Sequence, residues 1–380
     1  MKAVVLEELR AEAQDLVERL AAGLGLSPLQ SVSARLIEFI EGVRCAVDNG
    51  RSPMQLRAAI GWVRDIIRML PSTFGRRFEF DAALIASVLD EWDPTGATVS
   101  RFMIPRCTGE WGYFRVVMPP ENRDFGHTIR VVTFPGADRL SDIDLSDYPW
   151  LVHELAHDAF YRSMHHFRSS FGERLDARLQ QLRLRTAADT GSAARRAAQH
   201  LEALARYWTP RADQHDWAHE IATDVAAIWS LGPAFPMRFA RLLVDEPGAA
   251  WIAGDQHPPH VTRAEALALA AERLGWTDEA WALREEVAVL RHGLQLDSPS
   301  LMYADAELVL AAVETSLEAC RALSIPPMRA DRFARLRHAC KSVEVPVLSG
   351  IDLIAAAAIA RTNLSAVDYS AWHDQAVDRC

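Results

Sequence analysis

The sequence predicts a mainly α protein with a small β-sheet, an α+β fold with helical regions at both ends. Most segments repeat apolar residues at positions i, i+3 and i+4, the spacing of one helix face. Two short segments are instead rich in β-branched and aromatic residues and end at prolines, which is typical of strands. With 380 residues, 49% of them hydrophobic, the chain can bury a large core.

The N-terminal region, residues 1–72, is expected to be helical. Apolar residues recur with helical spacing over residues 3–48, with a break near 23–28. A second helix is predicted from Pro53 to Leu70, because Pro71 cannot continue it.

The two predicted strands lie in residues 111–120 and 127–135. The second precedes the central motif of the chain. A strand in that position can form the edge of a cleft, to which an extended peptide adds by backbone pairing. We expect residues 131–134 to line such an edge.

The central motif is His153-Glu154-Leu155-Ala156-His157, an H-E-x-x-H pattern inside an apolar run at 148–160 that predicts a buried helix. Positions i and i+4 of a helix share one face, so both imidazoles can bind a single Zn²⁺. The intervening Glu154 can then act as general base on a metal-activated water.

A catalytic zinc site needs a third protein ligand. The metzincin pattern requires Gly and His where this chain has Phe160 and Ser163, so that class is excluded. A second predicted helix at 215–229 carries Glu220 and, one turn later, Asp224. Such a pair allows the Glu to bind metal while the Asp accepts a hydrogen bond from a ligand His and fixes its orientation.

The predicted ligand set is therefore His153, His157 and Glu220, which leaves one open position as in other His₂Glu catalytic sites. Two alternatives remain for the third ligand. His215 and His219 are also four residues apart on the same predicted helix, and either could replace Glu220.

A third element, residues 254–263, contains His257 before two prolines and Arg263 at the start of an Ala-rich helix. Hydrolysis of a peptide bond builds negative charge on the carbonyl oxygen, and a cation or imidazole donor across the cleft stabilises it. His257 and Arg263 are the candidates, with Tyr161 and Tyr207 as weaker ones.

The order H-E-x-x-H, E-x-x-x-D, then His-Pro with an Arg six residues after the His resembles the gluzincin metallopeptidases. It is most similar to the CAAX prenyl protease family and its soluble relatives, over about residues 148–263. The resemblance implies a zincin-like catalytic core. It also implies zinc ligands His153, His157 and Glu220, the base Glu154, the orienting residue Asp224, and the substrate-binding and catalytic residues His257 and Arg263.

On this basis the core is expected at 73–263 and a C-terminal helical region at 264–380. A helical hairpin is expected to interrupt the core at about 165–210, with a break at 186–192. It is read either as a solvated amphipathic hairpin or as a lid or partner-docking arm that uses Arg174, Arg178, Arg183, Arg185, Arg195 and Arg196.

Composition restricts the partners and the location. The formal charge of −10 gives no reason to expect nucleic acid as a partner. Five scattered cysteines indicate neither a disulfide framework nor a zinc ribbon. The N-terminus becomes acidic too early for a signal peptide, and the apolar run at 354–360 is too short for a membrane span. We expect a cytoplasmic protein, and the sequence does not indicate its oligomeric state.

The sequence thus predicts a zinc-dependent endopeptidase that binds one Zn²⁺ per chain, acts on a protein or peptide substrate and uses Glu154 as general base. Two alternatives remain. The chain could be a zinc-binding regulatory or interaction protein with a non-catalytic site closed by a fourth protein ligand, for instance His219. It could also be a zinc amidase that acts on a non-peptide substrate.

Overall fold

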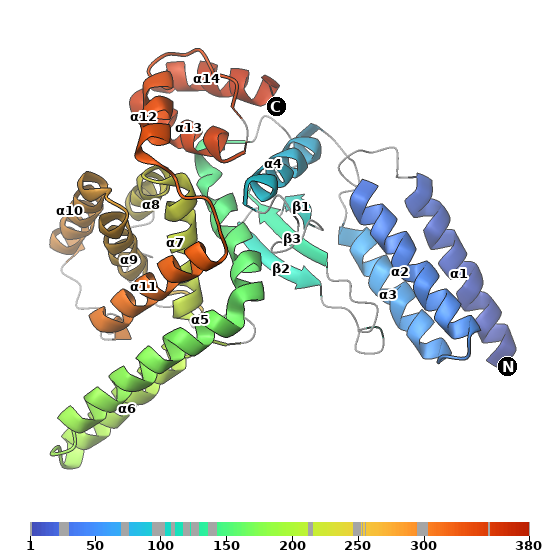
Figure 1. The fold of residues 1–380 in the computed structure, drawn as a ribbon, viewed down its shortest axis with the longest axis horizontal. Helices are drawn as coiled ribbons and strands as arrows, with labels where there is room; N and C mark the ends of the chain where they lie inside the picture. Colours follow the sequence, from blue (N-terminus) through green and yellow to red (C-terminus); the bar gives the residue numbers. More distant parts are fainter. Residues whose placement is uncertain are drawn as a thin grey trace. The chain divides into compact units, whose positions relative to one another are not determined.

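The structure is a computed structural model, and its described part is mainly helical (Figure 1), which confirms the mainly α prediction. The chain divides into two compact units, residues 1–86 with 100–143 and residues 87–99 with 144–380. The described residues are 2–22, 30–69, 76–92, 103–107, 111–116, 122, 129–135, 143–211, 216–245, 252, 254, 256–294, 303–348 and 350–379.

Three helices of the first unit pack against one another: α1 (Lys2–Ala22), α2 (Gln30–Asp48) and α3 (Pro53–Met69). Their apolar faces form a shared core, in which the rings of Phe39 and Trp62 meet edge to face at 5.1 Å. The predicted break at 23–28 lies outside the described residues. Helix α3 matches the helix predicted to begin at Pro53.

The first unit also contains a three-stranded sheet of order β1-β3-β2, made of β1 (Met103–Cys107), β2 (Gly112–Val116) and β3 (Ile129–Phe134). Strand β3 runs parallel to β1 and antiparallel to β2. Strands β2 and β3 lie within the two segments predicted as strands. Residues 131–134 belong to β3, and their role at a substrate cleft stays a prediction.

Helix α4 (Arg76–Trp92) crosses the division between the units. Its first turns carry a buried ion pair, Arg77 to Asp81 at 2.7 Å, and the Arg77 guanidinium lies 5.9 Å from the ring centre of Phe134. Because both side chains of the pair are almost inaccessible to solvent, each compensates the burial cost of the other.

The second unit is built around α7 (Trp217–Leu231), all of whose residues are buried. This explains the high proportion of apolar residues around the whole helix. Helix α7 packs against α5, α8, α9 and α11. The other elements of this unit are η5 (Leu145–Asp147), α5 (Pro149–Arg185), α6 (Gly191–Trp208), α8 (Ala234–Asp245), α9 (His260–Arg273), α10 (Thr277–Leu294), α11 (Ala306–Ala322), α12 (Ala330–Ala339), α13 (Gly350–Asn363) and α14 (Ala366–Arg379).

Both ends of α7 are fixed by local chemistry. Asp216 caps the N-terminus, where its carboxylate accepts hydrogen bonds from the backbone N–H groups of His219 and Arg211. Gly232 ends the helix with a φ of 58°, and a Cβ there would lie 2.7 Å from the side chain of Met328. Only glycine fits both constraints.

The predicted hairpin is present, but its first arm is not a separate helix. The motif helix continues without interruption to Arg185, so α5 is 37 residues long. A turn at 186–190 leads into α6, and the two helices pack against each other as they project from the rest of this unit (Figure 1).

The three regions proposed from the sequence, 1–72, 73–263 and 264–380, do not coincide with the two units. Helix α9 begins at His260 and packs on α7, and α11 packs on both α5 and α7. The compact unit therefore continues across residue 263. Among the described helices, none combines the length and the apolar character that crossing a bilayer requires.

Candidate metal centre

Helix α5 brings the motif residues together. His153 and His157 lie one turn apart, with their ring centres 5.1 Å apart and their planes nearly perpendicular. His153, Glu154 and His157 each offer a ligand atom, and these atoms lie within 4.8 Å of one another. His153 and Glu154 are buried, and His157 is nearly so. This group could hold a metal ion.

Helix α7 places Glu220 beside this group of His153, Glu154 and His157. Its Oε2 lies 3.6 Å from Nε2 of His153, and its Oε1 lies 3.6 Å from Nε2 of His157. Glu154 is further away, with Oε2 at 4.0 Å from Nε2 of His157. The carboxylate of Glu220 thus places one oxygen towards each imidazole, and its role as a metal ligand stays a prediction.

Glu220 also has an unsatisfied atom. Its Oε2 is buried and has no hydrogen-bond partner among the described residues, and its side chain is only 5% exposed. A buried carboxylate oxygen without a partner is costly unless a cation compensates it. Two imidazole nitrogens and one carboxylate oxygen are the donor set of catalytic zinc, so these residues fit Zn²⁺.

Asp224 lies behind the imidazole of His153. Its Oδ1 lies 2.9 Å from Nδ1 of His153, on the opposite side of the ring from the nitrogen that faces Glu220. This contact leaves Nε2 of His153 facing Glu220, and the role of Asp224 as the orienting residue stays a prediction.

Arg263 lies behind Asp224, and its Nε and Nη2 each donate a hydrogen bond of 2.7 Å to one carboxylate oxygen of Asp224. Trp150 and Phe239 flank this guanidinium, with ring centres at 5.5 Å and 5.4 Å. Arg263 is buried, and its nearest approach to Glu220 is 4.0 Å. The sequence placed Arg263 at the substrate, whereas in the structure Arg263 is buried against Asp224, which in turn contacts His153.

His257 approaches from the loop before α9. Its Nε2 lies 3.6 Å from Oε1 of Glu220, yet its side chain is 58% exposed. It is the most accessible of the imidazoles that contact Glu220. The structure therefore brings together every site residue predicted from the sequence: His153, Glu154, His157, Glu220, Asp224, His257 and Arg263.

The alternative residues are placed differently. His215 lies outside the described residues. His219 is buried and has its Nδ1 2.5 Å from Oδ2 of the capping residue Asp216. Tyr207 stacks on Trp217 with ring centres 4.7 Å apart. The side chain of Tyr161 is outside the described part.

Burial and neighbouring charges shift the acid–base properties of the site. Burial raises the pKa of Glu154 and raises that of Glu220 to about 7, although His153 and Arg263 oppose this. Burial and the positive charge of His153 hold the pKa of His157 well below its usual value. Burial would raise the pKa of Asp224, but Arg263 lowers it to about 2, so Asp224 stays ionised.

The sequence reasoning missed one polar residue at the site. Thr223 donates a hydrogen bond to the backbone carbonyl of Glu220, and its hydroxyl oxygen lies 3.4 Å from Nε2 of His153. Its spacing could have indicated this position, because Thr223 is three residues after Glu220 and therefore lies on the same face of α7.

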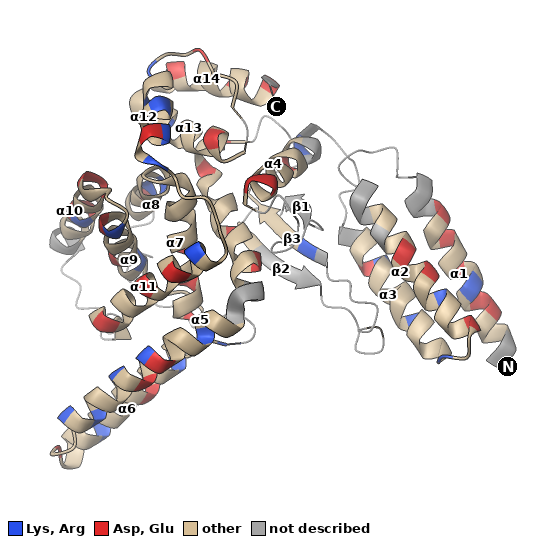
Figure 2. Cartoon of the chain, in the orientation of Figure 1, with Lys and Arg blue, Asp and Glu red and all other residues tan. Residues whose placement is uncertain are grey.

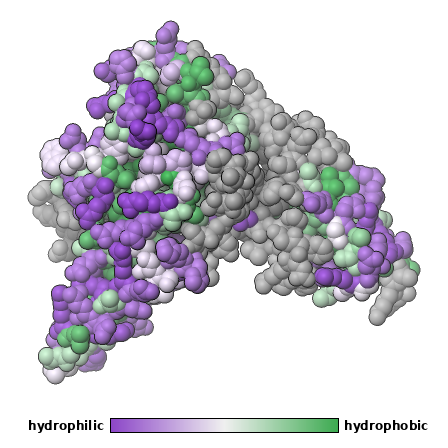
Figure 3. Space-filling view, viewed as in Figure 1, coloured by the Kyte–Doolittle hydropathy of each residue, from purple (hydrophilic) through white to green (hydrophobic). Residues whose placement is uncertain are grey.

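The Arg-rich hairpin is partly tied to α11. Arg174 contacts Glu314 and Glu318, and Arg178 contacts Asp305 and Glu307. Figure 2 shows basic residues along the hairpin, and Figure 3 shows its mainly hydrophilic surface with an apolar spot near the tip. Leu184, close to the turn between α5 and α6, is exposed. The remaining predicted arginines are exposed: Arg183, Arg185, Arg195 and Arg196.

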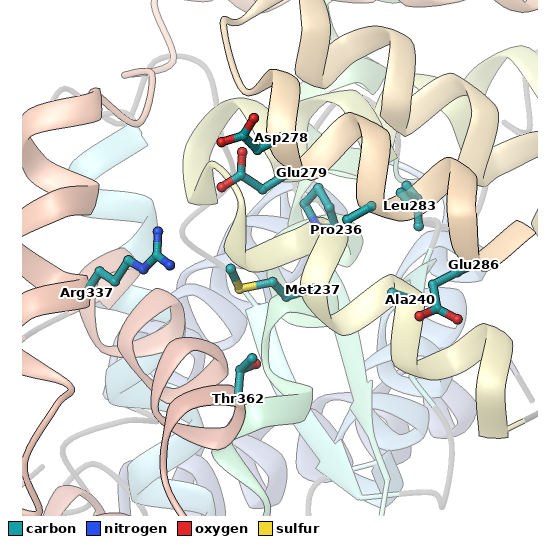
Figure 4. Close-up of a pocket in the computed structure, with 10 residues that line it drawn as sticks. Pro236, Met237, Ala240, Asp278, Glu279, Leu283, Glu286, Arg337 and Thr362 are labelled. Atoms are coloured by element: carbon teal, nitrogen blue, oxygen red, sulfur yellow. The ribbon is translucent and has the colours of Figure 1, made fainter.

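A separate cavity of about 410 Å³ lies in the same unit and shares no lining residue with the metal-ligand group. In Figure 4, Asp278 and Glu279 lie close together on one side of it, and Arg337 extends towards it from another helix. Met237 lies between this acidic pair and Arg337. This cavity is not part of the candidate metal centre.

Comparisons of this chain with protein-family profiles, with curated proteins and with solved structures found no match. The interpretation of the site therefore depends on its own geometry and donor chemistry.

Proposed function

We propose that this chain is a zinc-dependent endopeptidase of gluzincin type with one zinc site, located in the cytoplasm. The observation that supports it most is the position of Glu220, with its carboxylate oxygens 3.6 Å from the facing nitrogens of His153 and His157. In tetrahedral zinc sites with bonds of about 2.0–2.2 Å, neighbouring ligand atoms lie about 3.3–3.6 Å apart. The 3.6 Å contact that each oxygen of Glu220 makes with one imidazole nitrogen lies at the upper end of that range.

When bound, zinc would polarise the substrate carbonyl and lower the pKa of a water molecule. Glu154 lies next to the ligand nitrogens, and its carboxylate accepts the proton of the attacking water. The same carboxyl then delivers that proton to the leaving amine. Burial raises the pKa of Glu154, which favours its protonated form in the second step.

The other residues of the site position these groups. Arg263 holds Asp224, and Asp224 holds Nδ1 of His153, so Nε2 of His153 faces the metal position. His257 is the exposed imidazole of the site and is the group that can reach substrate from the solvent side.

The second candidate is a zinc-binding regulatory or interaction protein with a non-catalytic site. His257 favours it, because a fourth protein ligand would close the coordination shell. A zinc amidase with a non-peptide substrate would use the same groups as the peptidase and differs only in what it cleaves.

The experiment is a metal determination by elemental mass spectrometry, followed by a peptide-library cleavage assay. We expect about one zinc per chain in the wild type, much less in Glu220→Ala, and no change in Glu285→Ala, which alters an exposed carboxylate on α10. Cleavage by the zinc-loaded wild type supports the peptidase. A folded wild type that takes up no added zinc contradicts the proposal, and zinc binding without cleavage of any peptide favours the second candidate or the amidase.

A further inference from the structure

The position of His257 relative to Glu220 repeats that of the two motif histidines. Each of the three imidazoles has its Nε2 3.6 Å from an oxygen of this one carboxylate: His153 from Oε2, and both His157 and His257 from Oε1. Oxyanion stabilisation requires a donor that faces the substrate. It does not require the Nε2 of that donor to lie 3.6 Å from Glu220, the carboxylate proposed to bind the metal.

Hydrogen bonds and two buried prolines hold the backbone around His257, so the position of this backbone relative to α7 is set by the fold. The N–H of Gly254 donates to the carbonyl of His257 at 3.0 Å. The indole N–H of Trp217, the first residue of α7, donates to the carbonyl of Gly254 at 3.1 Å. On the other side, Pro258 and Pro259 are buried and lead directly into α9.

The side chain of His257, in contrast, is largely accessible to solvent. It is 58% exposed, compared with 5% for Glu220, and described neighbours do not enclose it as Trp150 and Phe239 enclose Arg263. Rotation about its side-chain bonds can therefore move the imidazole away from Glu220 while the backbone stays in place.

We propose that His257 is a displaceable fourth zinc ligand, an inference that rests on the proposed metal site. With its imidazole turned towards Glu220, the shell of His153, His157, Glu220 and His257 is complete and the site is latent. When the imidazole turns outwards, a water molecule takes the vacated position and the site is open for hydrolysis. The exchange swaps one neutral donor for another and needs no redox partner. An extended substrate that occupies the space of the His257 ring would drive it.

The test measures zinc affinity by competition with a chromophoric chelator, in the full chain, for the wild type, His257→Ala, His260→Ala and Glu220→Ala. His260 is the matched control, because it is on the same segment but packs against Phe239 at 6.2 Å between ring centres. We expect His257→Ala to weaken zinc binding by about 10-fold or more and His260→Ala to leave it unchanged.

X-ray absorption of the zinc-loaded proteins gives a second readout that does not depend on activity. The wild type should show three imidazoles bound to zinc, and His257→Ala should show two. Cobalt substitution should give a visible spectrum that changes in His257→Ala and not in His260→Ala.

The outcomes separate this inference from the proposed function. Zinc that is lost in Glu220→Ala but keeps its affinity and spectrum in His257→Ala overturns the fourth-ligand role and leaves the metal site standing. Three bound imidazoles in the wild type, with no peptide cleavage by the wild type or by His257→Ala, support the ligand role of His257 and contradict the peptidase. A wild type that binds no zinc overturns both.

Discussion

Two buried carboxylates lie beside the same pair of histidines, and their positions give them different chemistry. Glu220 has its oxygens 3.6 Å from Nε2 of His153 and of His157, whereas Oε2 of Glu154 lies 4.0 Å from Nε2 of His157. The shorter contacts favour Glu220 as the ligand. In the proposed mechanism Glu154 is then the group that transfers protons.

We therefore expect Glu154→Gln to keep about one zinc per chain and to lower kcat/KM by about 10²–10⁴-fold, the usual contribution of a general base. Glu220→Gln should instead lose zinc. Metal analysis and steady-state kinetics on the same preparations check both. Loss of zinc from Glu154→Gln would exchange the two assignments.

A second prediction at the residue scale concerns stability. Arg263 is buried together with the ionised Asp224, with which it forms an ion pair. Arg263→Met would leave the Asp224 carboxylate buried without its cation and should lower the free energy of unfolding by about 3–5 kcal/mol. Arg284→Met is the control: this arginine also contacts two carboxylates, Glu265 and Glu272, but it is partly exposed and should cost less than about 1 kcal/mol.

Urea unfolding of the metal-free proteins measures both values. Adding Asp224→Asn to Arg263→Met should restore part of the loss, since the buried negative charge is then removed. Equal, small effects of the two arginine substitutions would show that Arg263 does not hold Asp224 in the folded chain.

At the scale of elements, Asp305 joins the hairpin to α11. It caps α11 by accepting from the backbone N–H groups of Glu307 and Leu308, and it accepts from Arg178 of α5 at 2.7 Å. Asp305→Ala should lower the free energy of unfolding by about 2–4 kcal/mol, because both interactions are lost. Asp305→Asn keeps a capping oxygen and should cost less, which thermal or urea unfolding can measure. Arg174→Ala, at a more exposed pair with Glu314, should have a smaller effect.

A buried contact between η5 and α14 gives a pH-dependent prediction. The Tyr369 hydroxyl donates to Asp144 at 2.6 Å and accepts from the backbone N–H of Ser146. Burial would raise the pKa of Asp144, but the hydrogen bonds from Tyr369 and Ser146 outweigh it and lower that pKa.

A carboxyl with a lowered folded-state pKa stabilises the fold above its unfolded pKa of about 3.9, and the stabilisation is lost as the pH falls through the folded value. Tyr369→Phe should therefore cost about 1–3 kcal/mol at neutral pH, and the difference from the wild type should shrink below about pH 4. Stability curves against pH for both proteins measure this. A difference that stays constant down to acid pH would exclude the ionised Asp144 as the partner.

Helical spacing predicted more of the site than of its surroundings. His153 and His157 share a helix face in any α-helix, and the spacing of Glu220 and Asp224 holds for the same reason. The position of Arg263 could not be read from the sequence, because its partner is 39 residues away and its burial depends on Trp150 and Phe239. The sequence analysis also did not predict the full length of α5, although no proline interrupts residues 150–185.

At the scale of the whole molecule, the site residues all belong to one of the two units. His153 and His157 are on α5, Glu220 is on α7, and His257 precedes α9. A ligand that binds only the folded state stabilises the structure that forms its site. The helices α1–α3 form their own core in the other unit and contribute none of these residues.

We therefore expect zinc to protect the two units unequally. Hydrogen exchange followed by mass spectrometry on the full chain should slow in peptides from α5, α7 and α9 when zinc is added, by up to about 100-fold at a free zinc concentration 100 times the dissociation constant. Exchange in α1–α3 should stay the same. Glu220→Ala is the control and should show no zinc response in either unit. Equal slowing in α1–α3 and in α5 would mean that the two units open as one cooperative structure, because metal binding would then stabilise residues that take no part in the site.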